Sequence, residues 1–411
     1  MRTPTRRESG RGTAREGIWL PGAAVCAMVL LGGCGTAAGA PETSAAPGSA
    51  PQSAAATPAP NPRSFRLVVS GDPLLHEDFF YQARKDAAVT GKPDMDFAPL
   101  LANTKAVVES ADLAICHMET SIGPDEGPFS GYPLFSSPPQ IITALKETGY
   151  DFCTTASNHS FDTGAQGIDQ TLGKMDAAGI GHVGSARTQA EADTPAITTV
   201  STANGPVKVA NLAYAFGFNG LPYPNDETWR ANIIDVPKIL ADARKAKAAG
   251  ADVVVLNMHW GTEYQAEPDA DQVAQANALT ASPDIDIILG GHAHVVQPIQ
   301  KINNKWVIFG TGNLFGCHRD FGDPDEEGVM GRFTFTEKPG GGFEASNAEY
   351  LPILATCTFD GDSRVMNIPV ALATGDYGAY GRDRLELAQA RTTATVDSLG
   401  GSGQGLQPLT Q

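Results

Sequence analysis

The chain of 411 residues carries a formal net charge of −17 at pH 7, and 42% of its residues are hydrophobic. A chain of this length and apolar content can bury a sizeable core, in one large domain or in a few smaller ones. The acidic balance argues against a nucleic-acid partner, because a polyanion is repelled unless a local basic patch attracts it, and the sequence contains no such patch.

Residues 1–33 are typical of a bacterial export signal. Five arginines precede an apolar run over residues 17–31, and this run is short for a membrane span. The run ends in Leu-Gly-Gly-Cys-Gly, which resembles the lipobox of bacterial lipoproteins, where the cysteine is lipidated and becomes the mature N-terminus. We therefore expect Cys34 to anchor the protein to the cell membrane on the extracytoplasmic side. The alternative is an ordinary signal peptide with a chance cysteine.

Residues 34–62 consist mainly of Ala, Pro, Ser, Thr and Gly, and almost no large apolar side chain occurs among them. Such a segment cannot bury enough apolar surface to fold, and we interpret it as a disordered tether. The alternative is a flexible arm without function. A folded domain is predicted over residues 63–399, and residues 400–411, rich in Gly, Ser and Gln, are predicted to be a disordered tail.

Apolar strand-like runs alternate with helix-like segments throughout the predicted domain, which favours an α/β fold of sheets covered by helices. Strands are expected at residues 65–70, 112–117, 150–155, 207–214, 252–257, 285–289 and 305–309. Helices are expected at residues 97–110, 139–148, 237–249, 272–280 and 382–399. Residues 330–336 and 344–354, which three consecutive glycines separate, predict an antiparallel hairpin.

Four cysteines lie beyond the export signal, and an exported protein would hold them in an oxidising compartment. Cys116 and Cys153 occur in apolar strand-like runs, which predicts small buried hydrophobic side chains. A disulfide between Cys317 and Cys357 is a second expectation, although the sequence does not determine connectivity. The chain has no Cys-x-x-Cys pair, and this argues against a thiolate zinc site.

Polar side chains of the kinds that bind metals follow directly after the predicted strands, where loops at the edge of a sheet gather functional residues. One such residue would mean little, but a series of them, each after an apolar run, is hard to obtain by chance. In chain order the series is Asp72, Glu119, Asn158, His159, His259, His292 and His294.

This set matches what a dinuclear hydrolytic site requires. One carboxylate must bridge two cations, further oxygen and nitrogen ligands must fix each cation, and a position must stay open for water. Hard oxygen ligands beside imidazoles suit manganese, iron or zinc. The stretch Gly-Gly-His-Ala-His at residues 290–294 lets two imidazoles face different ions. The sequence therefore predicts two divalent transition metal ions.

The order of these motifs resembles the calcineurin-like metallophosphoesterase superfamily and, within it, the CapA family of poly-γ-glutamate capsule proteins. The similarity is carried by residues 111–122, 152–164, 253–265 and 287–315. These include Asn-Met-His-Trp-Gly-Thr-Glu-Tyr and Gly-Thr-Gly-Asn-Leu-Phe. The resemblance implies a four-layer sandwich of two mixed sheets flanked by helices.

The resemblance also implies a role for each residue of the series. Asp72 and His294 would hold the first ion, and Glu119 would bridge both ions. The second ion would be completed by Asn158, His259 and His292. A hydroxide between the ions would be the nucleophile.

Two features of the pattern need separate interpretation. His159 would bind no metal but would stand beside the phosphoryl group as a general acid or as a stabiliser of charge. Many members of the superfamily carry Asp-x-His at the first motif, whereas position 74 here is Leu. His76 is a candidate replacement, and its alternative is a surface or hydrogen-bonding role. His117, two residues before Glu119, either supports the ligands from behind or belongs to the core.

Loops beside the motifs contribute three candidates for a substrate pocket, Asn219, Glu263 and Asn313; the alternative for each is a turn or packing role. Together these features predict an exported, lipid-anchored protein that hydrolyses phosphoester-type bonds in the synthesis, export or anchoring of an extracellular polymer. The polymer, poly-γ-glutamate, follows from the resemblance alone. Hydrolysis of another envelope phosphate is a second enzymatic alternative.

A non-catalytic alternative is an assembly or binding subunit of an envelope polymer machinery that keeps the metal site for structure. His159 favours catalysis, because a purely structural site has no need of a histidine that binds no metal beside its asparagine ligand. We therefore interpret the sequence as that of a metal-dependent hydrolase.

Overall fold

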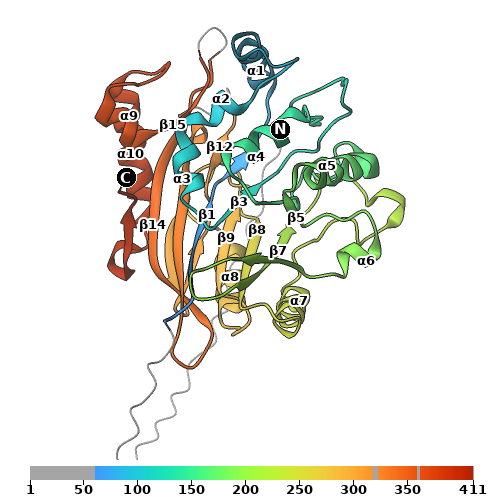
Figure 1. Cartoon of the computed structure of the whole chain (residues 1–411), viewed down its shortest axis with the longest axis vertical. Helices are drawn as coiled ribbons and strands as arrows, with labels where there is room; N and C mark the ends of the chain where they lie inside the picture. The colour runs from blue at the N-terminus through green and yellow to red at the C-terminus, as the bar shows by residue number, and fades with distance from the viewer. Residues whose placement is uncertain (1–60, 318–322, 359–361, 411) are drawn as a thin grey trace, which may run out of the picture. The chain divides into compact units, whose positions relative to one another are not determined.

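The computed structural model describes residues 61–317, 323–358 and 362–410, and all of them belong to one folded unit (Figure 1). The predicted export signal, Cys34 and nearly all of the predicted tether lie outside the described residues. Within the described ranges, no helix combines the length and the apolar composition that crossing a membrane requires.

The first sheet is mixed and has eight strands, in the order β15-β14-β13-β1-β3-β4-β5 with β16 beside β14. Its centre is parallel from β1 through β3 and β4 to β5, whereas β13 runs antiparallel to β1 and to β14. The strands are β1 (Ser64–Val69), β3 (Leu113–His117), β4 (Phe152–Thr154), β5 (Gly181–Val183), β13 (Glu327–Glu337), β14 (Phe343–Ala355), β15 (Val365–Asn367) and β16 (Leu406–Pro408).

The second sheet has six strands in the order β10-β11-β9-β8-β7-β6, and it is parallel from β7 to β11. A separate short pair, β2 with β12, lies in the segments that follow β1 and β11 along the chain. The strands are β2 (Asp72–Pro73), β6 (Ala196–Val200), β7 (Val207–Ala215), β8 (Val253–His259), β9 (Ile287–Gly291), β10 (Ile299–Ile302), β11 (Lys305–Ile308) and β12 (Asn313–Phe315).

The two sheets face each other across a continuous apolar core formed by inward side chains of β1 and β3 on one side and of β7, β8 and β9 on the other. Helices cover both outer faces. The first sheet is covered by α1 (Glu77–Thr90), α2 (Ala98–Leu101), α3 (Lys105–Glu109) and α4 (Gln140–Thr148). The second is covered by α7 (Val236–Ala248) and α8 (Ala270–Thr280). The predicted sandwich of two mixed sheets flanked by helices is confirmed.

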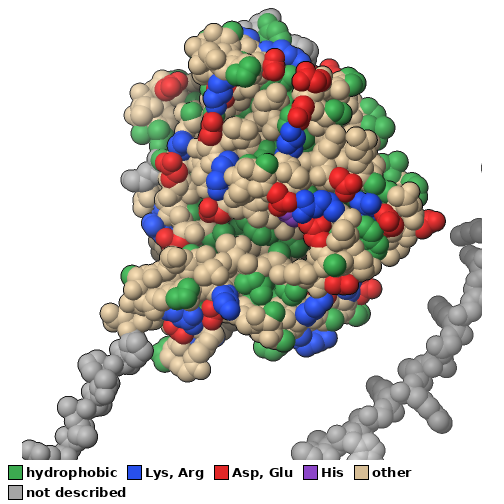
Figure 2. Space-filling model, turned by 45° about the vertical axis from the view of Figure 1, so that its right-hand side comes forward, with side chains coloured by type: hydrophobic (Ala, Val, Ile, Leu, Met, Phe, Trp, Pro, Cys, Tyr) green, Lys and Arg blue, Asp and Glu red, His purple; other side chains and the backbone are tan. Residues whose placement is uncertain are grey.

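The remaining helices lie at the margins of the sheets: α5 (Gly164–Ala178), α6 (Gln189–Ala192), α9 (Ile368–Thr374) and α10 (Arg382–Val396). Helices α9 and α10 pack on β14 and β15 at one side of the first sheet (Figure 1). A buried carboxylate fastens α10 to β13, because Glu327 accepts hydrogen bonds from Arg384 Nη1 at 2.7 Å and from Arg391 Nε at 2.8 Å. Elsewhere basic and acidic side chains lie interspersed, as Figure 2 shows for one face.

Local sequence explains where several helices begin and end. Helix α8 starts with a capping box in which Asp269 accepts from the backbone of Gln272, and the Gln272 side chain accepts from the backbone of Asp269. Helix α7 starts at Asp235, whose side chain accepts from Lys238 N. Helix α4 ends at Gly149, which adopts a left-handed conformation with φ of 113°.

The C-terminal tail is a correction to the sequence analysis. Disorder was expected over residues 400–411, but Leu406–Pro408 form β16, which pairs in parallel with β14. Leu406 and Leu409 are buried, and Leu409 N donates to Tyr350 O at 2.8 Å. Two apolar side chains and the backbone groups of a neighbouring strand hold the tail, and its Gly- and Ser-rich composition does not reveal such distant pairing.

The cysteines form two disulfides among the described residues. Cys116 and Cys153 are buried, as expected, but they are not free hydrophobic side chains: the two residues are paired in register on β3 and β4 and are bonded to each other. By restricting the unfolded chain, a bridge that closes a loop of 37 residues contributes about 4 kcal/mol to stability. The second bridge joins Cys317 and Cys357, as the sequence allowed.

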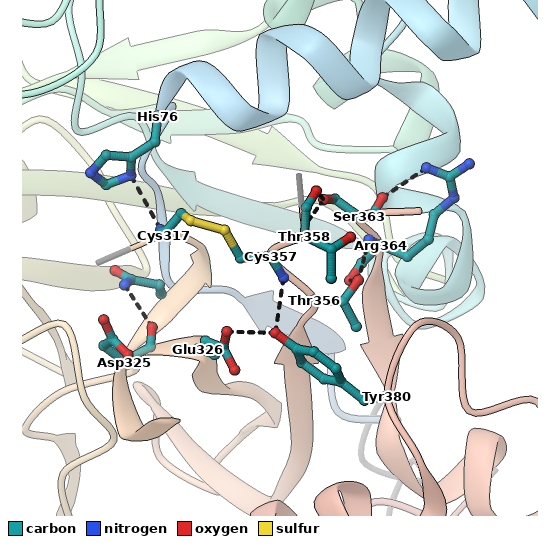
Figure 3. The surroundings of a disulfide bond; sticks show 11 residues. His76, Cys317, Asp325, Glu326, Thr356, Cys357, Thr358, Ser363, Arg364 and Tyr380 are labelled. Carbon is teal, nitrogen blue, oxygen red and sulfur yellow. Dashed lines mark hydrogen bonds between the residues drawn. A yellow bond between two sulfur atoms is a disulfide. The ribbon is translucent and has the colours of Figure 1, made fainter. Parts of the chain in front are cut away.

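The candidate ligand His76 lies beside the second disulfide. Its Nδ1 accepts a hydrogen bond from the backbone N of Cys317 at 3.2 Å (Figure 3). On the other side of this bridge, Cys357 N donates to the Tyr380 hydroxyl, which donates to Glu326 Oε1 at 2.6 Å. His76 is therefore placed beside the Cys317–Cys357 disulfide, and among the described residues it belongs to none of the groups of candidate metal ligands.

Candidate metal centre

The predicted ligands meet where strands of both sheets end. Asp72 lies in β2 just after β1, Glu119 follows β3, and Asn158 and His159 follow β4. The second sheet contributes the last residue of β8, His259, and the loop after β9, which holds His292 and His294. All seven side chains are buried, with exposed fractions of 5% or less. Their assembly follows from the parallel strands, whose carboxyl ends share one edge.

Glu119 lies at the centre of the group. Its Oε1 is 3.7 Å from His259 Nε2 and 3.8 Å from His294 Nε2. Asn158 Oδ1 lies 2.8 Å from His259 Nε2. Donor atoms of Asp72, Glu119 and His294 all lie within 4.8 Å of one another. Ligand atoms at about 2.1 Å from a shared ion are about 3 to 3.5 Å apart, and the Glu119 oxygen lies close to that spacing from both imidazoles.

Unpaired polar atoms show that the group fits cations. Within the described part of the chain, Asp72 Oδ1 and both oxygens of Glu119 are buried without a hydrogen-bond partner, as are His259 Nδ1 and His292 Nδ1. Burying a carboxylate without a partner costs several kcal/mol, and a bound cation offsets that cost. The donors are carboxylate, amide and imidazole groups, which suit manganese, iron or zinc.

Burial also shifts the pKa values of the predicted ligands. It raises the pKa of Asp72 to about 7 and the pKa of Glu119 well above its usual range, because a charged carboxylate loses hydration there. It lowers the pKa of His292 to about 3 and that of His259 well below its usual range. The imidazoles are therefore neutral, as metal ligands must be, whereas binding of cations would drive protons from the carboxylates.

Glycines permit the close approach of the β9 loop. A side-chain Cβ at Gly291 would lie 2.7 Å from Asp72 Oδ1, and one at Gly290 would lie 2.0 Å from Phe309 O. The backbone of His292 has φ of 88° and its N donates to Asp72 Oδ2 at 3.0 Å. Any side chain at Gly291 would thus displace a ligand.

His159 is positioned apart from the metal ligands. Its Nδ1 donates to Asp162 Oδ2 at 2.7 Å, and its ring meets the Phe135 ring edge-on at 4.7 Å between centroids. Asp162 also accepts from Phe135 N at 2.8 Å. This arrangement holds the ring in one orientation and places its Nδ1 proton on the carboxylate side. Asp162 was not predicted as a partner of His159, although a carboxylate three residues after the histidine was a signal for one.

The three pocket candidates all contact predicted ligands. Asn219 Oδ1 accepts from Asn158 Nδ2 at 3.2 Å, which orients the amide so that its oxygen lies toward His259. Asn313 Oδ1 accepts from His294 Nδ1 at 2.9 Å. Such partners orient metal ligands.

Two further side chains lie at the mouth of the site. The Glu263 carboxylate is 44% exposed and 3.9 Å from His292 Nε2. The Phe216 ring lies 4.4 Å from the His292 ring and is half exposed; the sequence analysis did not single it out. The mouth therefore combines an exposed negative charge with an apolar surface, both close to one predicted ligand, His292.

Residues 66–316 match the model of a known family, described as "Bacterial capsule synthesis protein PGA_cap". The chain belongs to this family. The PGA_cap segment contains every predicted metal ligand, together with His159 and the three pocket candidates. Strands β13 to β16 and helices α9 and α10 follow it along the chain.

Individual relatives carry related names. The chain is 30% identical to the capsule biosynthesis protein CapA of Bacillus anthracis over 182 residues, which cover 44% of this chain and 43% of that protein. It is 28% identical to the PGA biosynthesis protein CapA of Bacillus subtilis over 175 residues, 43% of this chain and 45% of that protein. The chain therefore matches less than half the length of these two relatives.

A solved structure is similar at lower identity. The calcineurin-like phosphoesterase YfkN of Bacillus subtilis is 17% identical with a TM-score of 0.43, and the match covers 81% of this chain and 97% of that one.

Proposed function

We propose that this PGA_cap member is a metal-dependent hydrolase of phosphoester-type bonds that acts in the synthesis, export or anchoring of an extracellular polymer such as poly-γ-glutamate. One observation carries the hydrolytic part: Glu119 lies between two imidazoles, and both of its buried oxygens have no hydrogen-bond partner among the described residues. The family and the names of the relatives support the polymer.

The arrangement divides the chemistry among named residues. Two divalent ions of manganese, iron or zinc would be held by Asp72 and the ligands around Glu119, and they would activate water and polarise the phosphoryl oxygens. His159, held by Asp162, would donate a proton to the leaving oxygen or stabilise the charge that develops there. A structural metal site has no use for such an oriented imidazole, which favours catalysis over a purely assembling role.

The charge of the surrounding loops favours some substrates over others. The described loops that follow β3, β4, β8 and β9, over residues 118–139, 155–163, 260–269 and 292–298, contain no lysine or arginine, and the first three contain acidic residues. The loop after β7 contains one basic residue, Arg230, which is buried and pairs with Glu227 and Asp169. In these loops bound cations would therefore be the main offset to the charge of a substrate. A dianionic phosphomonoester would be repelled more strongly than a monoanionic phosphodiester.

We therefore expect the purified, metal-loaded protein to hydrolyse phosphodiesters with a kcat/KM on the order of tenfold higher than phosphomonoesters of the same leaving group. Added salt should reduce the ratio of the kcat/KM for phosphodiesters to that for phosphomonoesters, because salt screens the loop charges. The test is a panel of both ester classes and glutamyl polymers, with metal content measured on the same samples. If the protein is fully loaded with metal but hydrolyses no compound of the panel, the result would favour the non-catalytic alternative, an assembly subunit.

Membrane attachment is a separate part of the proposal. Lipidated Cys34 would hold the domain on the extracytoplasmic side, and two disulfides support an oxidising compartment. Replacing Cys34 by alanine is expected to move the protein from the membrane fraction to the soluble fraction or to stop processing, which fractionation and N-terminal mass spectrometry would show. An unaltered protein that is fully soluble with another N-terminus would contradict the anchor.

A further inference from the structure

Besides the three histidines predicted as metal ligands, His117 also lies next to the predicted centre. His117 is the last residue of β3 and precedes Glu119 by two positions, and it is in register with Thr154 of β4. Side chains alternate along a strand, and the neighbouring Cys116 belongs to the core on the helix-covered face. His117 therefore faces the second sheet, on the same side as the end of β8.

The two ring nitrogens of His117 differ in their hydrogen bonding within the described residues. Nδ1 lies 2.6 Å from Thr154 Oγ1, whereas Nε2 is buried and has no hydrogen-bond partner in the described ranges. A ring nitrogen of His117 and donor atoms of Asp72 and His259 all lie within 4.8 Å of one another. The rings of His117 and His259 stack with centroids 4.8 Å apart.

The space between these side chains is small. A cavity of about 20 Å³ is lined by Asp72, His117, His259 and Gly291, among others. That volume admits a single water-sized particle or ion. A histidine that only packed there would leave a buried nitrogen without a hydrogen bond, which is unfavourable.

We propose that Nε2 of His117 is a ligand of the metal centre. It supplies an imidazole near Asp72, where Leu74 is a buried core side chain without a donor atom. Thr154 fixes the ring by holding Nδ1, as an outer partner does for a metal-binding histidine. This assignment rests on the proposed metal centre and adds a residue to it.

The test compares His117→Ala with the parent in equilibrium dialysis against Mn²⁺ or Zn²⁺, with metal counted by mass spectrometry. His117→Ala is expected to lose one ion per chain or to bind it at least 100-fold more weakly, and added imidazole is expected to restore binding by filling the vacated space. His182→Gln is the matched control, because His182 pairs with Asp176 away from the centre and its loss should change nothing.

Folding is followed on the same samples. Without metal, His117→Leu should melt no lower than the parent, since it removes an unsatisfied nitrogen, and its rise in Tm on adding metal should be smaller. Parent-like stoichiometry and affinity in His117→Ala would overturn the ligand assignment while leaving the proposed function intact. A parent that binds no metal would overturn both, and a fall in affinity that imidazole does not reverse would assign His117 to packing instead.

Discussion

Replacing Glu119 by alanine is expected to lower the affinity for both metal ions by more than about 100-fold, the largest effect of any single ligand change. The reason is its position: one oxygen lies 3.7 Å from His259 Nε2 and 3.8 Å from His294 Nε2, so a single carboxylate serves both halves of the centre. Metal content after dialysis, measured against the parent, gives the answer directly.

The fold should survive this change. Both Glu119 oxygens are buried and unpaired within the described structure, so their removal relieves an unfavourable burial when no metal is present. We expect the Tm of the metal-free variant to equal or exceed that of the metal-free parent. Glu386→Ala is the control, because that carboxylate is exposed, pairs with Arg382 and belongs to none of the candidate metal-ligand groups among the described residues. If Glu119→Ala binds both ions like the parent, another residue is the bridge.

The second large effect is expected from His159→Ala, which should lower turnover by about 10²- to 10⁴-fold while most of the metal is retained. His159 contacts Asp162 and Phe135, and it belongs to none of the metal-ligand groups of the described residues. His292→Ala should differ, because it loses metal as well as turnover. Turnover and metal content, measured on the same preparations, distinguish a loss of turnover with metal retained from a loss of both.

Asp162→Asn refines this test. It keeps the size of the partner but removes the charge that orients His159, so turnover should fall by less than in His159→Ala while the metal stays bound. The same variants should be assayed for polymer output in the native cell. Normal output from His159→Ala with its metal in place would refute the catalytic role and support an assembly subunit.

Most of the sandwich was predictable because its strands are continuous apolar runs. Val253–His259, buried along its whole length, has no other plausible place than the middle of a parallel sheet. Helix α4 was predictable from Ile141, Ile142 and Leu145 on one face and the terminating Gly149. The edge strands β5, β10 and β12 were not, since three or four residues carry too little pattern.

Helices α1 and α5 were missed for different reasons. In α5 the interior glycines Gly167 and Gly173 weaken the helical signal, yet Gly167 lies where a Cβ would collide with Thr163. Helix α1 contains Phe79 and Phe80, which are buried against the first sheet, among many charged residues. In both cases tertiary packing decides the structure, and one sequence read alone does not contain that information.

The predicted ligands could be recognised from the sequence more readily than the roles of the residues that hydrogen-bond to site residues. A strand end followed by Asp, Glu or His is a local signal, and the structure brings those residues together. The supporting residues Asp162, Asn219 and Asn313 act by contacts between distant loops, or by a side-chain direction that only the folded chain defines. The bond between Cys116 and Cys153 depends likewise on the register of two strands.

That disulfide lies one residue before His117 on one strand and one residue before Thr154 on the next, and so it holds together the two strands from which Glu119 and Asn158 emerge. In the proposed metal centre, disulfide formation and cation binding would therefore be coupled equilibria, and each would favour the other by the same free energy. A chain folded under reducing conditions would have a looser ligand set, whereas a loaded centre would shield the bridge from reductants. The affinity for the ions would therefore depend on whether Cys116 and Cys153 are bonded to each other.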